Sequence, residues 1–474
     1  MRIGWRLWMV LLVVCLSPGC STFTSYPDNI ESPLQNFEAG NFRAAFEEVE
    51  DRSQKGLNRL VYQLEAAMVL HTEGDLERSN EIFSRSEDTI RTYEEKAVVS
   101  ISDTAAQGAS LLVNEKTIPY QGEGFEKVLI HTYKGLNDLL LREYEEARVE
   151  IRRSFARQQE NRKRNEEEIE RLEEEARNNR LETRSMLRDV ESYYSDQSEI
   201  LNRVDNPYED PFAYYLSALV YELNGEFNDA YVDLQKVQEI RPGVPCVEND
   251  LLRMAKLSGL KDAYRSWSES LNRTARFADR EQEGEIILFF QCGMAPRKEE
   301  LKLALPIPEV GLVSLALPKY EAVPSRIAQV ALYGSDGTFK GETWVLTDLE
   351  AIAVRNLDDR MPILILKQVL RATAKGALAM TASDQGGLAA AIAVNLFNLV
   401  TEQADLRCWT TLPANLQVAR LALQQGRHDL VLAFQDASKG RVQEQPFSVD
   451  VGAGGKVFVN VRAGAQGVIA FHVF

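Results

Sequence analysis

A short pattern that breaks one helix and opens the next recurs along the first half of the chain. Four stretches share a turn residue, an aromatic residue or leucine two positions later, and a small residue three positions after that. They span 38–50, 72–83, 140–151 and 223–234. Each stretch opens an amphipathic helix, because its apolar residues return at helical spacing. A chain that repeats this unit is expected to fold as a series of helices that bury their apolar faces against one another.

The unit at 212–242 carries the pattern most completely. Gly225 stands at the turn, Phe227 follows it, Ala230 occupies the small position and Pro242 ends the second helix. In these features the unit resembles a tetratricopeptide (TPR) repeat, a helical hairpin in which small residues allow close packing. The resemblance is looser elsewhere, and the unit at 140–151 lacks the glycine.

Stacked repeats of this kind leave a concave surface that commonly binds a peptide or a partner helix. The resemblance therefore implies a partner-binding face, with Tyr215, Tyr221 and Phe227 as candidate contacts. The alternative is that the helical pairs only brace the molecule.

Dense charge interrupts the repeats between 158 and 205. A broken apolar stripe runs through the charged residues, which predicts a long helical hairpin or coiled coil. Its members are Ile169, Leu172, Ala176, Leu187, Val190 and Tyr194. Such a charge run is usually a solvated face, and a role in oligomerisation is the alternative.

The period of the sequence changes after about residue 280. Short β-rich segments separated by turn residues predict strands. They lie at 285–290, 311–318, 326–334, 416–423, 428–434, 456–462 and 467–474. The stretch 426–463 is expected to form the hairpins of a small antiparallel sandwich.

Two apolar helices are expected between these strand groups. The stretch at 388–400 is nearly all apolar, but it is too short to span a bilayer, so a buried core helix is expected. Contact with a membrane or a partner is the alternative. The other helix has Lys367, Arg371 and Lys375 on one face, a stripe that would suit solvent or an anionic lipid surface.

These patterns predict an α+β chain. All-α TPR-like repeats are expected at 35–157 and 206–279, with the charged hairpin at 158–205 inserted between them. A β-rich C-terminal domain with apolar helices is expected at 280–474.

The first residues have the form of a secretory signal peptide over 1–19. Arg2 and Arg6 precede an apolar run at 7–16, which is about half the roughly 20 residues that a spanning helix needs. Small and turn-forming residues follow and end at Cys20. The alternative is an ordinary signal in which this cysteine is incidental.

The segment that ends at Cys20, "LSPGC", resembles the lipobox of bacterial lipoproteins. The resemblance implies cleavage before Cys20 and attachment of lipid with acyl chains such as palmitate to its sulfur. Ser21 favours sorting to the outer membrane, and 20–34 is a polar tether. The chain is thus expected to be lipid-anchored on the periplasmic face.

Charge and motifs exclude several classes of function. The formal net charge of −17 disfavours nucleic acid and anionic surfaces as partners. No nucleophile elbow, zinc-protease motif, phosphate-binding loop or dinucleotide fingerprint is present in the sequence. The best enzyme candidate is a thiol, Cys292 or Cys408, working with His428 or His472. We expect no enzyme, no metal and no cofactor other than the lipid.

The stretch 401–423 places charge beside a tryptophan where an apolar helix meets a strand. Asp405 and Arg407 are expected to pair inside the protein and fix the helix against the sheet. The alternative is that Asp405, Arg407 and Trp409 form a recognition site for a peptide or glycan.

The order of lipobox, repeat helices and three later motifs resembles a family of uncharacterised lipoproteins of Gram-negative bacteria with TPR-like repeats. The motifs are "MAPRKEE" (294–300), "LEAIAVRNLDDRMP" (349–362) and "TEQADLRCWTTLPA" (401–414). Genes of this family often lie near those of penicillin-binding-protein activator lipoproteins. The resemblance implies a scaffold or adaptor that binds envelope proteins in peptidoglycan synthesis, secretion or a flagellar structure. A self-assembling lipoprotein that forms a ring or multimer is the alternative.

Overall fold

The computed structural model describes residues 25–102, 115–179, 181, 183–307, 311–386 and 403–474. Cys20, the signal segment and the apolar stretch at 388–400 lie outside these residues. Within them, no helix is both long enough and apolar enough to cross a bilayer.

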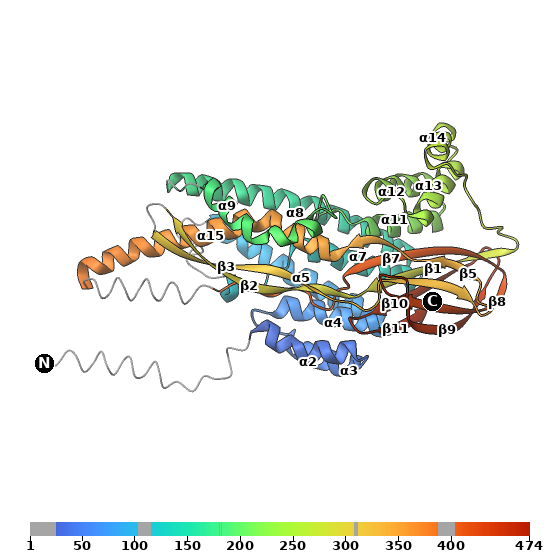
Figure 1. The fold of residues 1–474 in the computed structure, drawn as a ribbon, viewed down its shortest axis with the longest axis horizontal. Coiled ribbons are helices and arrows are strands. Elements are labelled where there is room, and N and C mark those ends of the chain that lie inside the picture. Colours follow the sequence, from blue (N-terminus) through green and yellow to red (C-terminus); the bar gives the residue numbers. More distant parts are fainter. Residues whose placement is uncertain (1–24, 103–114, 180, 182, 308–310, 387–402) are drawn as a thin grey trace.

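Antiparallel helical pairs form the first half of the described chain (Figure 1). The paired helices are α2 (Tyr26–Glu38) with α3 (Phe42–Arg52), α4 (Arg59–Glu73) with α5 (Leu76–Ser102), α7 (Gly124–Leu140) with α8 (Tyr144–Asn178), α11 (Pro211–Leu223) with α12 (Phe227–Ile240), and α13 (Pro245–Leu257) with α14 (Lys261–Leu271). The short elements are η1 (Glu115–Thr117), α9 (Thr183–Glu191), η2 (Ser192–Gln197) and α10 (Ser198–Leu201). The paired helices expected from the repeating pattern are therefore present.

The turns of the pairs explain the pattern of glycines. Gly40, Gly74 and Gly225 have φ angles of 75°, 97° and 77°, in the left-handed region that glycine enters without steric cost. Arg142 occupies the same position in the third unit with φ 66°. The turn therefore keeps its geometry there with a residue that disfavours it.

The charged segment leaves the repeats through the second half of α8 and returns through α9, η2 and α10. Both arms contact the long helix α15 (Leu349–Gly386). Leu172 and Ala176 of the predicted stripe pack against Ile363 and Leu366 of α15. This part of the stripe is therefore used within the chain.

The predicted basic stripe on α15 also faces the protein. Lys367 Nζ lies 2.6 Å from Glu168 Oε1 of α8, and Arg371 is buried. These two side chains therefore do not form the solvent- or lipid-facing surface that their spacing suggested.

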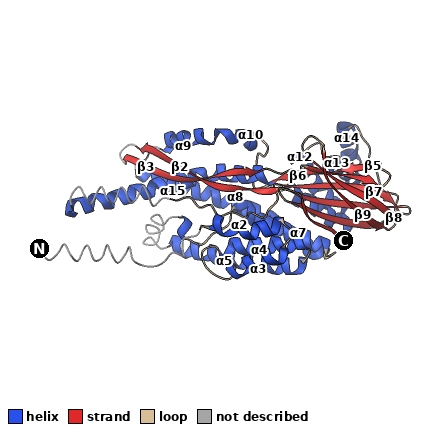
Figure 2. Ribbon diagram, turned by 60° about the horizontal axis from the view of Figure 1, so that its bottom comes forward, coloured by secondary structure: helices blue, strands red, loops and turns tan. Residues whose placement is uncertain are grey.

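The β-rich half contains two facing sheets and one long hairpin (Figure 2). The five-stranded sheet has the order β11-β10-β1-β7-β6, the four-stranded sheet has the order β5-β4-β8-β9, and β2 and β3 form the hairpin. The strands are β1 (Glu283–Cys292), β2 (Met294–Ile307), β3 (Gly311–Val323), β4 (Gln329–Gly334), β5 (Phe339–Glu342), β6 (Trp344–Asp348), β7 (Asn415–Gln424), β8 (Gly426–Gln435), β9 (Arg441–Val451), β10 (Lys456–Ala463) and β11 (Val468–Val473).

The stretch 426–463 was expected to contribute only antiparallel hairpins, and this was wrong in one respect. β8 and β9 do form an antiparallel hairpin, but β10 crosses to the other sheet and pairs in parallel with β1, where Ile287 lies opposite Phe458. Both faces of β1 are buried, with Ile286 toward the second sheet and Ile287 toward the helices. The strand is buried on two sides, which explains its continuous apolar run.

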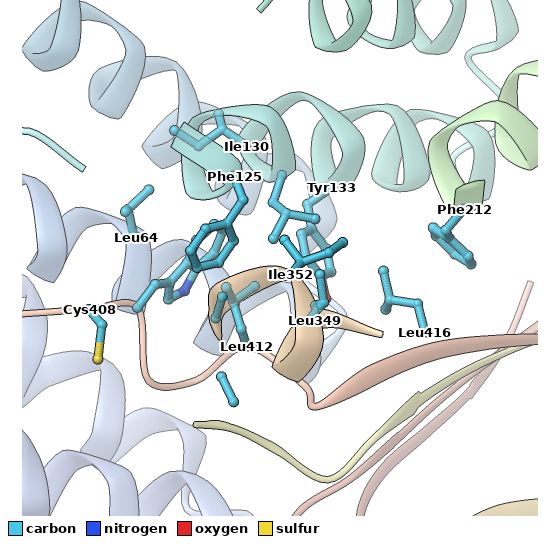
Figure 3. Close-up of a cluster of buried hydrophobic side chains, with 14 of the residues drawn as sticks. Leu64, Phe125, Ile130, Tyr133, Phe212, Leu349, Ile352, Cys408, Leu412 and Leu416 are labelled. Atoms are coloured by element: carbon cyan, nitrogen blue, oxygen red, sulfur yellow. The ribbon is translucent and has the colours of Figure 1, made fainter. Parts of the chain in front are cut away.

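Helices and sheet share one hydrophobic core. Figure 3 shows part of it, where Leu64, Tyr133 and Phe212 of the helical pairs lie with Leu349 and Leu416 of the C-terminal half. The boundary expected at residue 280 therefore divides the sequence but does not divide the core.

Candidate functional site

A segment of the C-terminal half, residues 404–414, lies between the helical pairs; we call it the strap. Glu65 of α4 is completely buried and binds it through both carboxylate oxygens. Its Oε1 accepts from Thr410 N at 2.6 Å, and its Oε2 accepts from Thr411 N at 3.0 Å. Both threonine hydroxyls and the Tyr26 hydroxyl also donate to Glu65. Burial raises the pKa of Glu65, and these hydrogen bonds oppose that rise.

A second buried carboxylate, Glu126 of α7, holds the next part of the strap. It accepts from Trp409 N at 2.7 Å and from the Tyr120 hydroxyl at 2.6 Å. Burial, reinforced by the nearby charge of Glu123, raises the pKa of Glu126 to about 7.

The pKa of Glu123 shifts in the opposite direction from that of Glu126, although the two residues are only three positions apart. Burial alone would raise its pKa, but Arg360 and Lys298 hold the pKa of Glu123 well below its usual range. Lys298 Nζ also donates to Arg407 O at 3.1 Å, which ties β2 to the strap. Carboxylates from the helices and a lysine from the hairpin therefore fasten the strap in place.

The residues predicted at 405–409 are internal. Arg407 Nη2 lies 2.6 Å from Asp405 Oδ2, and Arg407 also donates to the Ile118 carbonyl at 3.0 Å. Trp409 is 1% exposed and packs on the rings of Phe83 and Tyr133. The internal ion pair expected between Asp405 and Arg407 is therefore present, and Trp409 offers almost no surface to a partner.

The three predicted contacts on the repeat have different environments. Tyr215 is fully buried and donates to Asp250 Oδ2 at 3.1 Å. Tyr221 and Phe227 are half-buried at the edge of the core. The structure therefore does not gather the three into one open face.

A buried ionic cluster lies where α11 and α13 pack against the five-stranded sheet. Arg420 of β7 contacts Glu222 of α11 at 2.6 Å and Glu285 of β1 at 2.7 Å. Arg253 of α13 contacts the same Glu222 at 2.7 Å, and Asp250 and Lys456 complete the cluster. Three acids balance three bases, so these two helices are docked on the sheet by paired buried charge.

The thiols proposed for catalysis are buried and have raised pKa values. Burial raises the pKa of both Cys292 and Cys408 to about 12, which keeps them as protonated, poorly nucleophilic thiols. The two histidines bond to main-chain carbonyl oxygens instead of to a thiol. His428 Nε2 lies 2.6 Å from Gln424 O, and His472 Nε2 lies 2.9 Å from Thr72 O. Nothing in the described residues supports a thiol nucleophile with a histidine base.

One group of side chains has the composition of a metal site. Ligand atoms of Glu87, His131 and Glu150 lie within 4.8 Å of one another. However, Lys134 Nζ lies 2.8 Å from Glu87 and 3.0 Å from Glu150, so an ammonium group already supplies the positive charge. We interpret the group as an ion-pair cluster.

An open cavity of about 950 Å³ lies between α13 and α14, the final pair of the repeat region. The cavity is lined by the end of α13, by α14 and by the residues that follow α14. Four of the lining residues are basic. The lining residues are Ala255, Lys256, Gly259, Lys261, Tyr264, Arg265, Ser268, Glu269, Asn272, Arg273 and Thr274. This cationic cavity is the candidate binding site.

Two features shape the cationic cavity. Gly259 (φ 71°) makes the turn between α13 and α14, and Asn272 ends α14 with φ 49°. Lys256 Nζ lies 5.7 Å from the ring centre of Tyr264 and 5.4 Å from that of Phe277, so its ammonium is held over aromatic faces.

The pair at 245–271 falls within the TPR-like region expected at 206–279, but sequence reasoning did not single it out and so missed this cavity. The signal was present: Gly259 occupies the turn, and Tyr264 and Trp267 lie on one face of the following helix. The four basic residues lie within 256–273, and Lys261 and Arg265 stand four positions apart on α14, a spacing that places both on one helix face and could have marked it as basic.

Comparisons with known proteins give distant structural likenesses. No protein-family model matches the chain, and no curated protein matches it. A solved kinesin light chain protein of Podosopora anserina with nearly identical TPR-like repeats is 13% identical, covering 52% of this chain and 92% of its own, with a TM-score of 0.28. The TPR2AB domain of yeast Sti1 in complex with pHSP90 is 14% identical over the same shares, with a TM-score of 0.20. Similarity at this level does not assign the chain to a family.

Proposed function

We propose that the protein is a lipid-anchored adaptor that holds a partner protein in an assembly of the bacterial cell envelope. The anchor is Cys20, supported by the lipobox-like sequence that ends there. The tether expected at 20–34 was too long, because α2 begins at Tyr26 and buries Tyr26, Ile30 and Leu34 in the folded body. Few residues therefore separate Cys20 from the folded body.

The observation that carries the proposal is that the groups with potential for chemistry are buried, whereas the cationic cavity is open to solvent. The thiols are buried, and so are Glu65 and Glu126, the carboxylates that bind the strap; the thiol–histidine pairs have no support in the geometry of the described residues. The cationic cavity, in contrast, is open and lies on α14, toward the end of the molecule opposite the end of α15 (Figure 1). A body of this kind is suited to presenting a binding surface.

The finer features of the proposal come from the sequence resemblance. We place the protein in the outer membrane with the body in the periplasm, and peptidoglycan synthesis, secretion and flagellar assembly are the candidate settings. The partner is an envelope protein that contributes a peptide or a helix.

Crosslinking in living cells, followed by affinity capture from the envelope fraction, tests the adaptor role. We expect the wild type to recover one defined partner and Cys20→Ser to lose both acylation and most of that partner. Recovery of the protein only as its own multimers would contradict the adaptor and favour self-assembly. Membrane-bound, acylated Cys20→Ser protein would contradict the anchor.

A further inference from the structure

We propose that the cationic cavity between α13 and α14 binds an acidic peptide segment of the partner protein. The inference rests on the proposed adaptor function and names the part of the partner that is recognised.

The first argument is local charge. The chain carries a formal net charge of −17, yet the cavity walls hold four cations, Lys256, Lys261, Arg265 and Arg273, against one acid, Glu269. A positive patch on an acidic protein attracts acidic segments and orients them during encounter.

The second argument is the set of interactions that these cations already make. Arg273 Nη1 lies 2.7 Å from Glu248 Oε2, so its charge is largely neutralised. Arg265 lies 3.7 Å from Asp262, and both side chains are highly exposed, so this contact is weak. Lys256 faces aromatic rings instead of a carboxylate. A ligand carboxylate would therefore gain more from Lys256, Lys261 and Arg265 than from Arg273.

The third argument is the form of the cavity. The cavity is open to solvent rather than enclosed, and Gly259 and Tyr264 are among its lining residues. At Gly259 an added Cβ would meet no atom within 4 Å, so a ligand backbone can approach the turn. An extended acidic segment satisfies both the charge and the shape.

The experiment measures binding of a fluorescein-labelled, Asp/Glu-rich peptide to the full mature chain carrying Cys20→Ser, by fluorescence anisotropy. The test variant is the double substitution Lys261→Glu with Arg265→Glu. The matched control is Arg43→Glu with Lys55→Glu, two exposed cations elsewhere on the molecule whose reversal changes the net charge by the same amount.

We expect the wild type and the control to bind alike, the test variant to bind at least about tenfold more weakly, and added salt to weaken wild-type binding. Equal binding by test and control variants, or no binding by the wild type, would overturn the proposal. Binding of anionic phosphatidylglycerol vesicles but not of the peptide, lost in the test variant, would overturn it in favour of a lipid surface. A wild-type dimer that the test variant dissociates would overturn it in favour of a second copy.

The same variant in cells separates this inference from the proposed function. If capture still recovers the partner with Lys261→Glu and Arg265→Glu, the adaptor role stands and the cavity is not its site. If the wild type recovers no partner, the adaptor role itself fails.

Discussion

Replacement of Glu65 by glutamine should destabilise the whole protein, because this carboxylate holds the strap with both oxygens. Thr410 N and Thr411 N donate to different oxygens, at 2.6 and 3.0 Å. Glutamine has only one oxygen, so in either orientation its NH2 group meets one of these two N–H groups. The hydroxyls can rotate to accept, but a backbone N–H cannot.

The expected cost follows from this count. A hydrogen bond to a charged acceptor contributes about 1.5–3 kcal/mol, and a buried donor left unpaired adds a desolvation penalty. We therefore expect Glu65→Gln to lower the free energy of unfolding by about 2–4 kcal/mol, a sizeable part of the roughly 5–15 kcal/mol typical of native proteins.

Urea unfolding, followed by far-ultraviolet circular dichroism, gives this free energy. Hydrogen exchange at Thr410 and Thr411 should accelerate more than exchange elsewhere in the core. Glu73→Gln is the matched control, since Glu73 is exposed at the end of the same helix and should leave the unfolding midpoint unchanged. A change below about 0.5 kcal/mol for Glu65→Gln, or unchanged protection of the two amides, would refute the reasoning.

Four other substitutions test three separate parts of the structure. Arg142→Gly should stabilise the protein by about 0.5–1 kcal/mol in urea unfolding, because φ 66° is costly for arginine, and Gly225→Arg at the equivalent turn should destabilise it; a loss of stability with Arg142→Gly would contradict this account of the turns. Arg420→Met should cost about 3–5 kcal/mol by calorimetry, because it leaves Glu222 and Glu285 without their central cation, and a variant as stable as the wild type would show that the cluster does not dock the helices. The raised pKa of Glu126, about 7, means that the folded state holds this proton more tightly than the unfolded state, so its stabilising effect is full below about pH 4.5 and is lost as the pH rises through 7. The thermal unfolding midpoint of Glu126→Gln should therefore fall less between pH 5 and pH 8 than the midpoint of the wild type. An equal fall in both proteins would refute the assignment of this pH dependence to Glu126.

Local periodicity predicted the elements well. The strands around 285–290 and 456–462 and the helical pair around Gly225 appear where their patterns placed them. Burial on both faces gives β1 a continuous apolar run, and each turn glycine marks a left-handed position. These are short-range effects, so they can be read from the sequence.

The arrangement of the elements could not be predicted in the same way. Ile287 pairs with Phe458, 171 positions away, and nothing local specifies a parallel partner at that distance. Glu65 and Glu126 look like ordinary acids on amphipathic helices, yet both are buried against the strap. Tyr215 and Trp409, expected on open faces, therefore carry internal contacts, and the open site is instead the cavity where α13 and α14 meet.

Site-specific photo-crosslinking in living cells tests the tethered adaptor most directly. A photo-reactive residue is introduced in place of Arg265, in the cationic cavity, and separately in place of Arg43 on α3 as the control. We predict an adduct with one envelope protein from position 265 and none from position 43, and loss of the adduct in Cys20→Ser. Adducts only between copies of the chain, or the same adducts from both positions, would contradict the account.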